Sequence, residues 1–140
     1  MIQYPLKFQV SSKMDKNWSA TAPGQSPLNC AIPPQFGGPG NGFSPEDFFG
    51  MAVMSCFMAS FKVFAGKNEL TFSSLEGSTE ITVDRNEKNS VSITQVDLQF
   101  SLKGASDVEK ARALLEEAKN NCIVANSINS TTNFNFTING

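Results

Sequence analysis

Apolar and polar residues alternate at the start of the chain, with the period of a half-buried β-strand. The alternation covers residues 3–11, and its apolar positions are Tyr4, Leu6, Phe8 and Val10. Residues 18–21 and 28–32 form two further short strand-like stretches, separated by the turn signal Pro23-Gly24. The first part of the chain therefore predicts three short strands.

A loop and a long apolar helix follow these strands. Residues 33–42 are rich in proline and glycine, which predicts a loop. Ser44 is suited to cap a helix, the proline after it fits the first helical position, and Asp47 lies three residues beyond the cap. The helix is apolar on almost every side, and we expect it to end near residue 65, with Gly66 as the C-terminal stop. Such a helix needs partners around it, which predicts a central position and favours oligomerisation.

The second half of the chain predicts a hairpin, a helix and a closing strand. Residues 71–84 and 90–102 alternate, are rich in β-branched residues and flank a polar turn. Ser106 and Glu109 form a predicted capping box, which starts an amphipathic helix with one apolar stripe: Val108, Ala111, Leu114, Leu115 and Ala118. A short helix over residues 122–128 and a strand over 133–139 complete the chain. Because the strands cluster, the order predicts an α+β fold.

Length and composition restrict the classes of function. A chain of 140 residues with 40% hydrophobic residues predicts one domain, residues 1–140, with its own core. The net charge of -2 and the scattered basic residues argue against nucleic acid as a partner. The chain has 0 histidines, which excludes a histidine base, a Ser-His-Asp triad and imidazole metal ligands. No metal site is predicted.

The cellular location is predicted from the cysteines and the chain start. Three widely spaced cysteines are unlike a disulfide framework, and residues 1–10 lack the pattern of a signal peptide. The long apolar helix contains Ser55, Ser60 and Lys62 within an otherwise ordinary soluble composition, so no membrane span is expected. A reducing, cytoplasmic location is the prediction.

Two cysteines are candidates for redox chemistry. Cys56 lies in the middle of the apolar helix among small residues that leave room for a second sulfur atom. Cys122 lies at the start of a short helix, where backbone N–H groups favour a thiolate. Such a pair suggests that one thiolate attacks and the other thiol resolves. Cys30 has neither feature, and the alternative for all three is an inert buried thiol.

Two motifs carry a resemblance to a known family. The stretch PPQFGGPGNGFSPEDFFGMAVMSCFMASF and the later NCIVANSI resemble the OsmC/Ohr family of osmotically inducible and organic hydroperoxide resistance proteins. The resemblance covers almost the whole chain. It implies an OsmC-like fold, in which two central helices pack against antiparallel β-sheets in an intertwined homodimer with active sites at the subunit interface.

The resemblance also implies roles for individual residues. Cys56 would be the peroxidatic thiol, Cys122 the resolving thiol and Glu46 the active-site glutamate. No bound cofactor is expected, and a lipoyl or similar dithiol would reduce the disulfide. Four residues of the loop before the helix and of the helix itself are candidate substrate contacts: Gln35, Phe36, Phe49 and Phe57. The alternative is that the aromatic residues of the helix belong to the core, as such a stripe more often does.

Glu46 and Cys56 lie ten residues apart in one predicted helix. About 15 Å of axial rise separates them, so within one helix they cannot touch. If both serve one site, Glu46 comes from the partner chain or acts through an intermediary. The alternative is that Glu46 is a first-turn acid favoured by the helix dipole.

The family's catalytic arginine is not found at its usual positions. The loop position holds Gln35, and the N-terminal segment offers only Lys13 and Lys16, which carry point charges without a planar fork. Arg85 and Arg112 fall elsewhere. Three hypotheses therefore stay open: a thiol peroxidase for organic hydroperoxides, an OsmC-like protein that binds a hydrophobic small molecule without peroxidase activity, and a structural dimer with inert cysteines.

Overall fold

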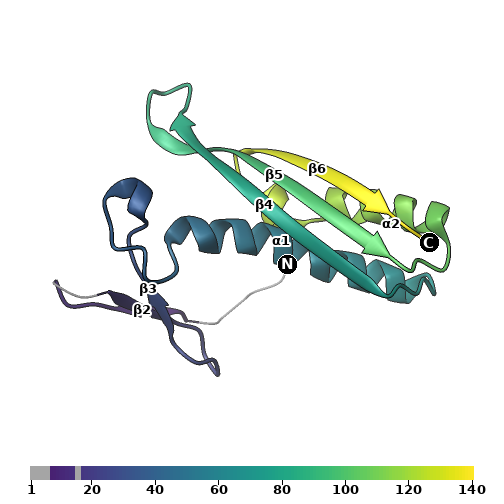
Figure 1. The fold of residues 1–140 in the computed structure, drawn as a ribbon, viewed down its shortest axis with the longest axis horizontal. Coiled ribbons are helices and arrows are strands. Elements are labelled where there is room, and N and C mark those ends of the chain that lie inside the picture. The colour runs from purple at the N-terminus through teal and green to yellow at the C-terminus, as the bar shows by residue number, and fades with distance from the viewer. Residues whose placement is uncertain (1–6, 15–16) are drawn as a thin grey trace. The chain divides into compact units, whose positions relative to one another are not determined.

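A computed structural model describes residues 7–14 and 17–140 of the chain, which divides into two compact units, Met1–Phe48 and Phe49–Gly140 (Figure 1). The first unit contains β1 (Gln9–Ser11), β2 (Trp18–Thr21), β3 (Leu28–Cys30), the 3-10 helix η1 (Pro34–Phe36) and the first turn of α1 (Pro45–Lys67). The second contains the rest of α1, β4 (Ser74–Arg85), β5 (Val91–Lys103), α2 (Val108–Asn120), α3 (Ile123–Asn126) and β6 (Thr131–Ile138). This order confirms the α+β prediction, and the single domain stays a prediction.

The N-terminal unit holds an antiparallel sheet in the order β1-β2-β3. Gly24 takes a left-handed φ of 76° in the turn before β3, as the Pro-Gly signal predicts. The described part of the first strand is shorter than predicted, and residues 3–6 lie outside the described residues. Its apolar side chains are not half-buried as expected, since Phe8 is 68% and Val10 75% exposed. No described residue covers this apolar surface.

Local hydrogen bonds set both ends of α1. Ser44 Oγ accepts from the backbone N–H of Asp47 at 3.0 Å, and Asp47 Oδ2 accepts from that of Ser44 at 2.9 Å, which confirms the predicted cap. The prediction that Gly66 stops the helix is wrong. The helix continues to Lys67, Glu69 takes a left-handed φ of 55°, and the N–H of Leu70 bonds to the carbonyl of Ala65 at 2.9 Å.

The sheet of the C-terminal unit has the order β4-β5-β6 and is mixed. β4 and β5 form the predicted antiparallel hairpin, whereas β6 pairs with β5 in parallel. A parallel neighbour requires a crossover, and α2 and α3 carry the chain back from the end of β5 to the start of β6. The expectation of purely antiparallel sheets therefore does not extend to β6.

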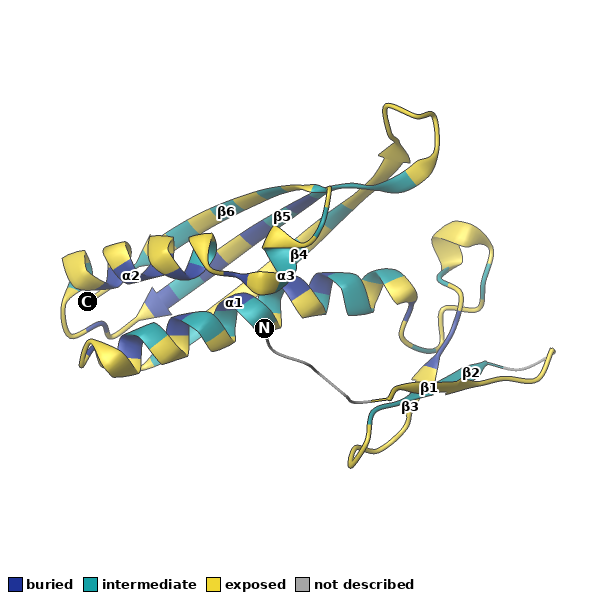
Figure 2. Cartoon of the chain, turned by 180° about the vertical axis from the view of Figure 1, so that it is seen from behind, coloured by how far each residue is buried: buried dark blue, intermediate teal, exposed yellow. Residues whose placement is uncertain are grey.

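Both main helices of the C-terminal unit cover one face of this sheet (Figure 2). Four residues of β5 face them: Val96, Leu98, Phe100 and Leu102. α1 contributes a buried stripe of Gly50, Val53, Phe57, Phe61 and Ala65, and α2 one of Ala111, Leu114, Leu115 and Ala118. Although α1 is long and apolar enough to cross a membrane by length and composition, this stripe makes it a core helix.

The cap of α2 differs from the prediction by one residue. Asp107, rather than Ser106, is the N-cap, and its Oδ1 accepts from the backbone N–H of Lys110 at 3.0 Å. Ser106 Oγ instead accepts from the backbone N–H of Thr71 at 3.1 Å. The Ser106 hydroxyl, which was expected to cap α2, therefore forms a long-range hydrogen bond with Thr71 instead.

Candidate thiol site

The structure brings Cys56 and Cys122 together in the C-terminal unit. Cys56 lies in the middle of α1 and is half-buried, whereas Cys122 is the N-cap of α3 and is fully buried. The Cys56 thiol lies near enough to Cys122 to raise its pKa, and Cys122 Sγ donates to the backbone carbonyl of Val53, one turn before Cys56, at 3.9 Å. All three cysteines are free thiols. The packing of α3 on α1 therefore creates a reduced pair in which one thiol is more accessible.

Burial raises the pKa of the Cys122 thiol from 9.0 to about 11. Backbone N–H groups of Ala125 and Val124, at the start of α3, act in the opposite direction, and the neighbouring Cys56 adds to the rise. The backbone N–H groups at the helix start thus favour a thiolate, as expected, but desolvation outweighs their effect. At neutral pH Cys122 holds its proton.

This raised pKa predicts a loss of stability at alkaline pH. The folded protein binds the Cys122 proton more tightly than the unfolded chain, so the free energy of unfolding should fall as the pH rises from 9.0 towards about 11. Urea unfolding across this range measures the slope, and Cys122→Ser removes the titrating group. The variant should lose less stability than the wild-type protein over the same range. Equal slopes for both proteins would contradict the assignment.

Glu46 has an unsatisfied carboxylate oxygen. It lies in the first turn of α1, in the N-terminal unit, and its Oε2 is buried without a hydrogen-bond partner among the described residues. A buried carboxylate oxygen without a donor is costly, so such an atom indicates a missing partner. The association of Glu46 with the thiols stays a prediction.

The predicted substrate contacts lie in different surroundings. Gln35 and Phe36 are exposed on η1, and Phe49 is half-buried against the core of the C-terminal unit. Phe57 is fully buried, and its ring lies 4.3 Å from that of Phe100 between centroids, with two rings of β6 also close. Phe57 is a core residue with no surface left for a substrate in this chain, which corrects that prediction.

An apolar groove on the flank of α1 was missed by the sequence reasoning. It has a volume of about 570 Å³ and is lined by Met54, Ser55, Met58, Ala59, Lys62, Gly77 and Phe100. A Cβ at Gly77 would lie 2.5 Å from Cε1 of Phe100, so only glycine lets that ring lie this close to the backbone of β4. A glycine inside a strand signals such close approach. Cys56 is not among the lining residues, so the methionines form a surface separate from the thiol.

The cations lie as follows. Arg85 stays in the turn between β4 and β5, where its guanidinium donates to the carbonyl of Asn89 at 2.9 Å, and Arg112 is exposed on α2. Lys13 is exposed in the N-terminal unit, and Lys16 lies outside the described residues. Among residues 7–14 and 17–140, no group of three or more His, Cys, Asp or Glu side chains could hold a metal ion.

Comparisons with known proteins identify the fold. A structure of an OsmC-like protein of unknown function from Vibrio cholerae superposes with a TM-score of 0.85 at 20% identity, covering 96% of this chain and 99% of that one. The organic hydroperoxide resistance protein OsmC of Legionella pneumophila gives 0.78 at 18% identity, covering 100% of both chains. A candidate organic hydroperoxide resistance protein of Vibrio cholerae, with captopril bound in one of its active sites, gives 0.75 at 18%, covering 99% and 95%.

The family assignment rests on the sequence as well as on the fold. A comparison with curated protein sequences gives no match. The family model described as OsmC-like protein matches residues 38–137, which include both cysteines of the pair. The chain therefore belongs to the OsmC-like protein family.

Proposed function

We propose that the protein is a thiol peroxidase that reduces organic hydroperoxides. The observation that carries this proposal is the proximity of the half-buried thiol of Cys56 to the buried, protonated thiol of Cys122, whose pKa it helps to raise. Their unequal exposure suits a two-step reaction, in which the accessible thiol reacts with the substrate and the buried thiol then reacts with the oxidised sulfur. Membership of the family, and structural similarity to organic hydroperoxide resistance proteins, support the same assignment.

In the first step the Cys56 thiolate attacks an oxygen of the hydroperoxide. The O–O bond breaks, the sulfur is oxidised to a sulfenic acid, and the alkoxide leaves as an alcohol after it takes a proton. In the second step the sulfur of Cys122 attacks the sulfenic sulfur, and its proton and the hydroxyl leave as water. An external dithiol, of the lipoyl type or similar, then reduces the disulfide by thiol–disulfide exchange and is itself oxidised.

A homodimer would complete the site. The N-terminal sheet leaves Phe8 and Val10 exposed, and Val63 on α1 is 53% exposed. A second copy is a suitable cover for apolar surface of this kind. The buried, unpartnered Oε2 of Glu46 also calls for a donor. In the proposed dimer Glu46 orients the peroxide beside the partner's thiols, Lys13 and Lys16 are the candidates for the cation, and the cytoplasm supplies reducing conditions.

Mass spectrometry of the protein after reaction with peroxide tests the proposal. Reduced protein mixed with cumene hydroperoxide should consume the peroxide and gain a Cys56–Cys122 disulfide, which requires β-carbons within about 4.5 Å. Cys30 should stay reduced, because it is fully buried and its Sγ bonds to the carbonyl of Leu28 in its own strand. Cys30→Ser is the matched control and should form the same disulfide. Unchanged peroxide and intact thiols would reject the peroxidase.

The groove favours a second candidate function, the binding of a hydrophobic small molecule without catalysis. Its methionine and phenylalanine lining suits an apolar ligand, and it does not include Cys56. This function predicts that an apolar ligand binds equally well to the wild-type protein and to Cys56→Ser, while neither protein consumes peroxide.

A further inference from the structure

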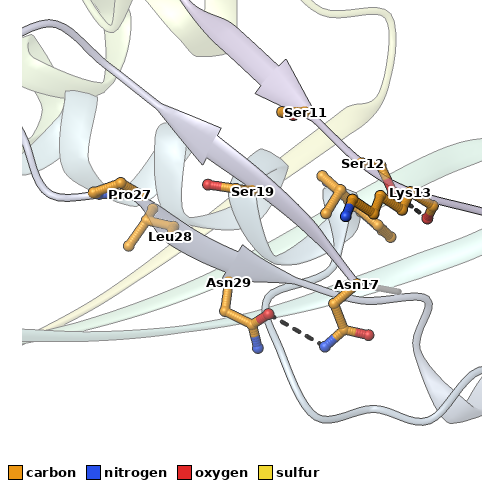
Figure 3. Close-up of a pocket in the computed structure, with 9 residues that line it drawn as sticks. Ser11, Ser12, Lys13, Asn17, Ser19, Pro27, Leu28 and Asn29 are labelled. Atoms are coloured by element: carbon orange, nitrogen blue, oxygen red, sulfur yellow. Dashed lines mark hydrogen bonds between the residues drawn. The ribbon is translucent and has the colours of Figure 1, made fainter. Parts of the chain in front are cut away.

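Asparagine side chains connect separate segments in both units of the chain. In the N-terminal unit, Asn17 Nδ2 donates to Asn29 Oδ1 at 3.2 Å, which links the residue before β2 to β3 (Figure 3). In the C-terminal unit, Asn126 Nδ2 donates to the backbone carbonyl of Asn120 at 3.1 Å. Cys122 lies between these two residues in the chain. The bond of Asn126 therefore closes a short loop of the chain around the candidate resolving thiol.

The segment that carries Cys122 is too short to hold its own position. α3 contains four residues, Ile123–Asn126, and Cys122 is its N-cap. A helix of one turn is not stable alone, because its first turn fixes several residues for a single hydrogen bond. Ile123 is 75% exposed, so its side chain adds little packing. The position of Cys122 therefore depends on the bonds that attach this segment to its neighbours.

Asn126 forms two of these bonds. Its backbone N–H bonds to the carbonyl of Cys122 at 2.9 Å, which closes the single turn of α3. Its side-chain amide donates to the carbonyl of Asn120, which as the last residue of α2 has no acceptor role within that helix. One bond fixes the turn, and the other attaches the turn to the end of α2. Asn126 thereby holds the backbone of Cys122 beside α2.

The side chain of Cys122 reaches α1 from this position. Its Sγ donates to the backbone carbonyl of Val53 at 3.9 Å, one turn before Cys56. Beyond α3, the hydroxyl of Ser130 donates to the backbone carbonyl of Ile93 in β5 at 2.6 Å. The segment that carries the thiol is thus attached to α2 on one side of α3 and to β5 on the other.

We propose that Asn126 is a positioning residue for the resolving step, holding Cys122 where its sulfur can attack the oxidised sulfur of Cys56. The proposal rests on the proposed peroxidase mechanism. In this step the S–S bond forms, the S–O bond of the sulfenic acid breaks, and the hydroxyl leaves as water with the Cys122 proton. Cys56 belongs to the 23-residue α1, so its own position does not depend on α3. Only the second step should depend on Asn126, since precise placement of a reacting group accelerates its reaction.

Asn126→Asp tests the side-chain donor with little change of shape, because a carboxylate cannot donate. In a single turnover with cumene hydroperoxide, the variant should consume peroxide at the wild-type rate and form the Cys56–Cys122 disulfide about tenfold more slowly. Dimedone should trap the sulfenic acid that accumulates on Cys56. Asn126→Ala should behave in the same way, which excludes an effect of the new charge. Asn126→Gln keeps an amide donor and should recover most of the wild-type rate of disulfide formation.

Asn121→Ala is the matched control. Asn121 directly precedes Cys122, and its Nδ2 also donates to a carbonyl near the end of α2, that of Glu117, at 2.8 Å. That bond joins α2 to its own C-cap and does not involve α3, so the variant should form the disulfide at the wild-type rate. Equal slowing in Asn121→Ala and Asn126→Ala, or slowing of peroxide consumption together with disulfide formation, would overturn the proposal. Wild-type rates in Asn126→Asp and Asn126→Ala would overturn it as well.

Equilibration with glutathione separates this proposal from the peroxidase, because it oxidises the thiol pair without a peroxide. Glutathione disulfide takes up two electrons and becomes two glutathione thiols as the Cys56–Cys122 disulfide forms. The equilibrium constant of this exchange should be about tenfold lower in Asn126→Asp, which raises the reduction potential of the pair by about 30 mV. An unchanged potential, or a wild-type pair that forms no disulfide, would contradict the positioning role. Absence of peroxide turnover with the shift intact would contradict only the peroxidase.

Discussion

Replacement of Cys56 by serine should lower the consumption of cumene hydroperoxide by at least about 1,000-fold, because a neutral hydroxyl replaces the attacking thiolate. Cys56 is the more accessible member of the reduced pair, so in the proposed mechanism no other group can start the reaction. The measurement is the rate of peroxide loss in the presence of a dithiol. Turnover that persists in Cys56→Ser would reject the mechanism.

The resolving thiol provides the comparison. Cys122→Ser should still oxidise at Cys56 and consume about one equivalent of peroxide in a single turnover, because the attacking thiol is intact. The sulfenic acid should then accumulate, and dimedone should trap it on Cys56. If Cys122→Ser instead turned over at the wild-type rate in repeated cycles, Cys122 would not be the resolving residue.

Local chemistry made the start of α1 predictable, and longer-range contacts determined what the sequence reasoning missed. The cap formed by Ser44 and Asp47 involves residues three apart, so the pattern alone identifies it. The end of the same helix depends on where Leu70 packs, since that buried residue holds the N–H that bonds back to Ala65. Gly66 has open space where a side chain would lie and is simply part of the helix.

Strand pairing shows the same limit. The alternation in residues 131–138 indicates a strand but does not say which neighbour it pairs with or in which direction. Its parallel pairing with β5 follows from the crossover through α2 and α3. The proximity of Cys56 and Cys122 was expected from the redox reading of the two thiols and from the family resemblance, whereas the protonated state of Cys122 depends on how deeply the fold buries it.

The candidate substrate contacts on α1 have different surroundings for a related reason. Phe49 and Phe57 are both aromatic residues of α1, so the sequence alone does not distinguish their roles. How each ring packs against the sheet determines its role. Phe57 faces Phe100, Phe134 and Phe136, and is therefore sealed in the core. The adjoining groove depends on the missing side chain of Gly77 in another element, which no periodicity in α1 reveals.

Truncation of Phe57 should be the most destabilising single substitution considered for the C-terminal unit. Phe57→Ala would remove a fully buried ring from a cluster of aromatic rings and leave a cavity between α1 and the sheet. Large-to-small changes of this kind cost about 3 to 5 kcal/mol, a large part of the about 5 to 15 kcal/mol that stabilises a domain. Urea unfolding at one protein concentration measures the loss, since self-association would otherwise shift the midpoint.

The matched control makes the same chemical change at an exposed position. Phe36 is 53% exposed on η1, so Phe36→Ala should change the free energy of unfolding by no more than about 0.5 kcal/mol. If Phe57→Ala fails to fold, Phe57→Leu retains part of the buried volume and should cost about 1 kcal/mol. A loss in Phe57→Ala no larger than that in Phe36→Ala would mean that Phe57 does not hold α1 against the sheet, and the assignment of Phe57 to the core would fail with it.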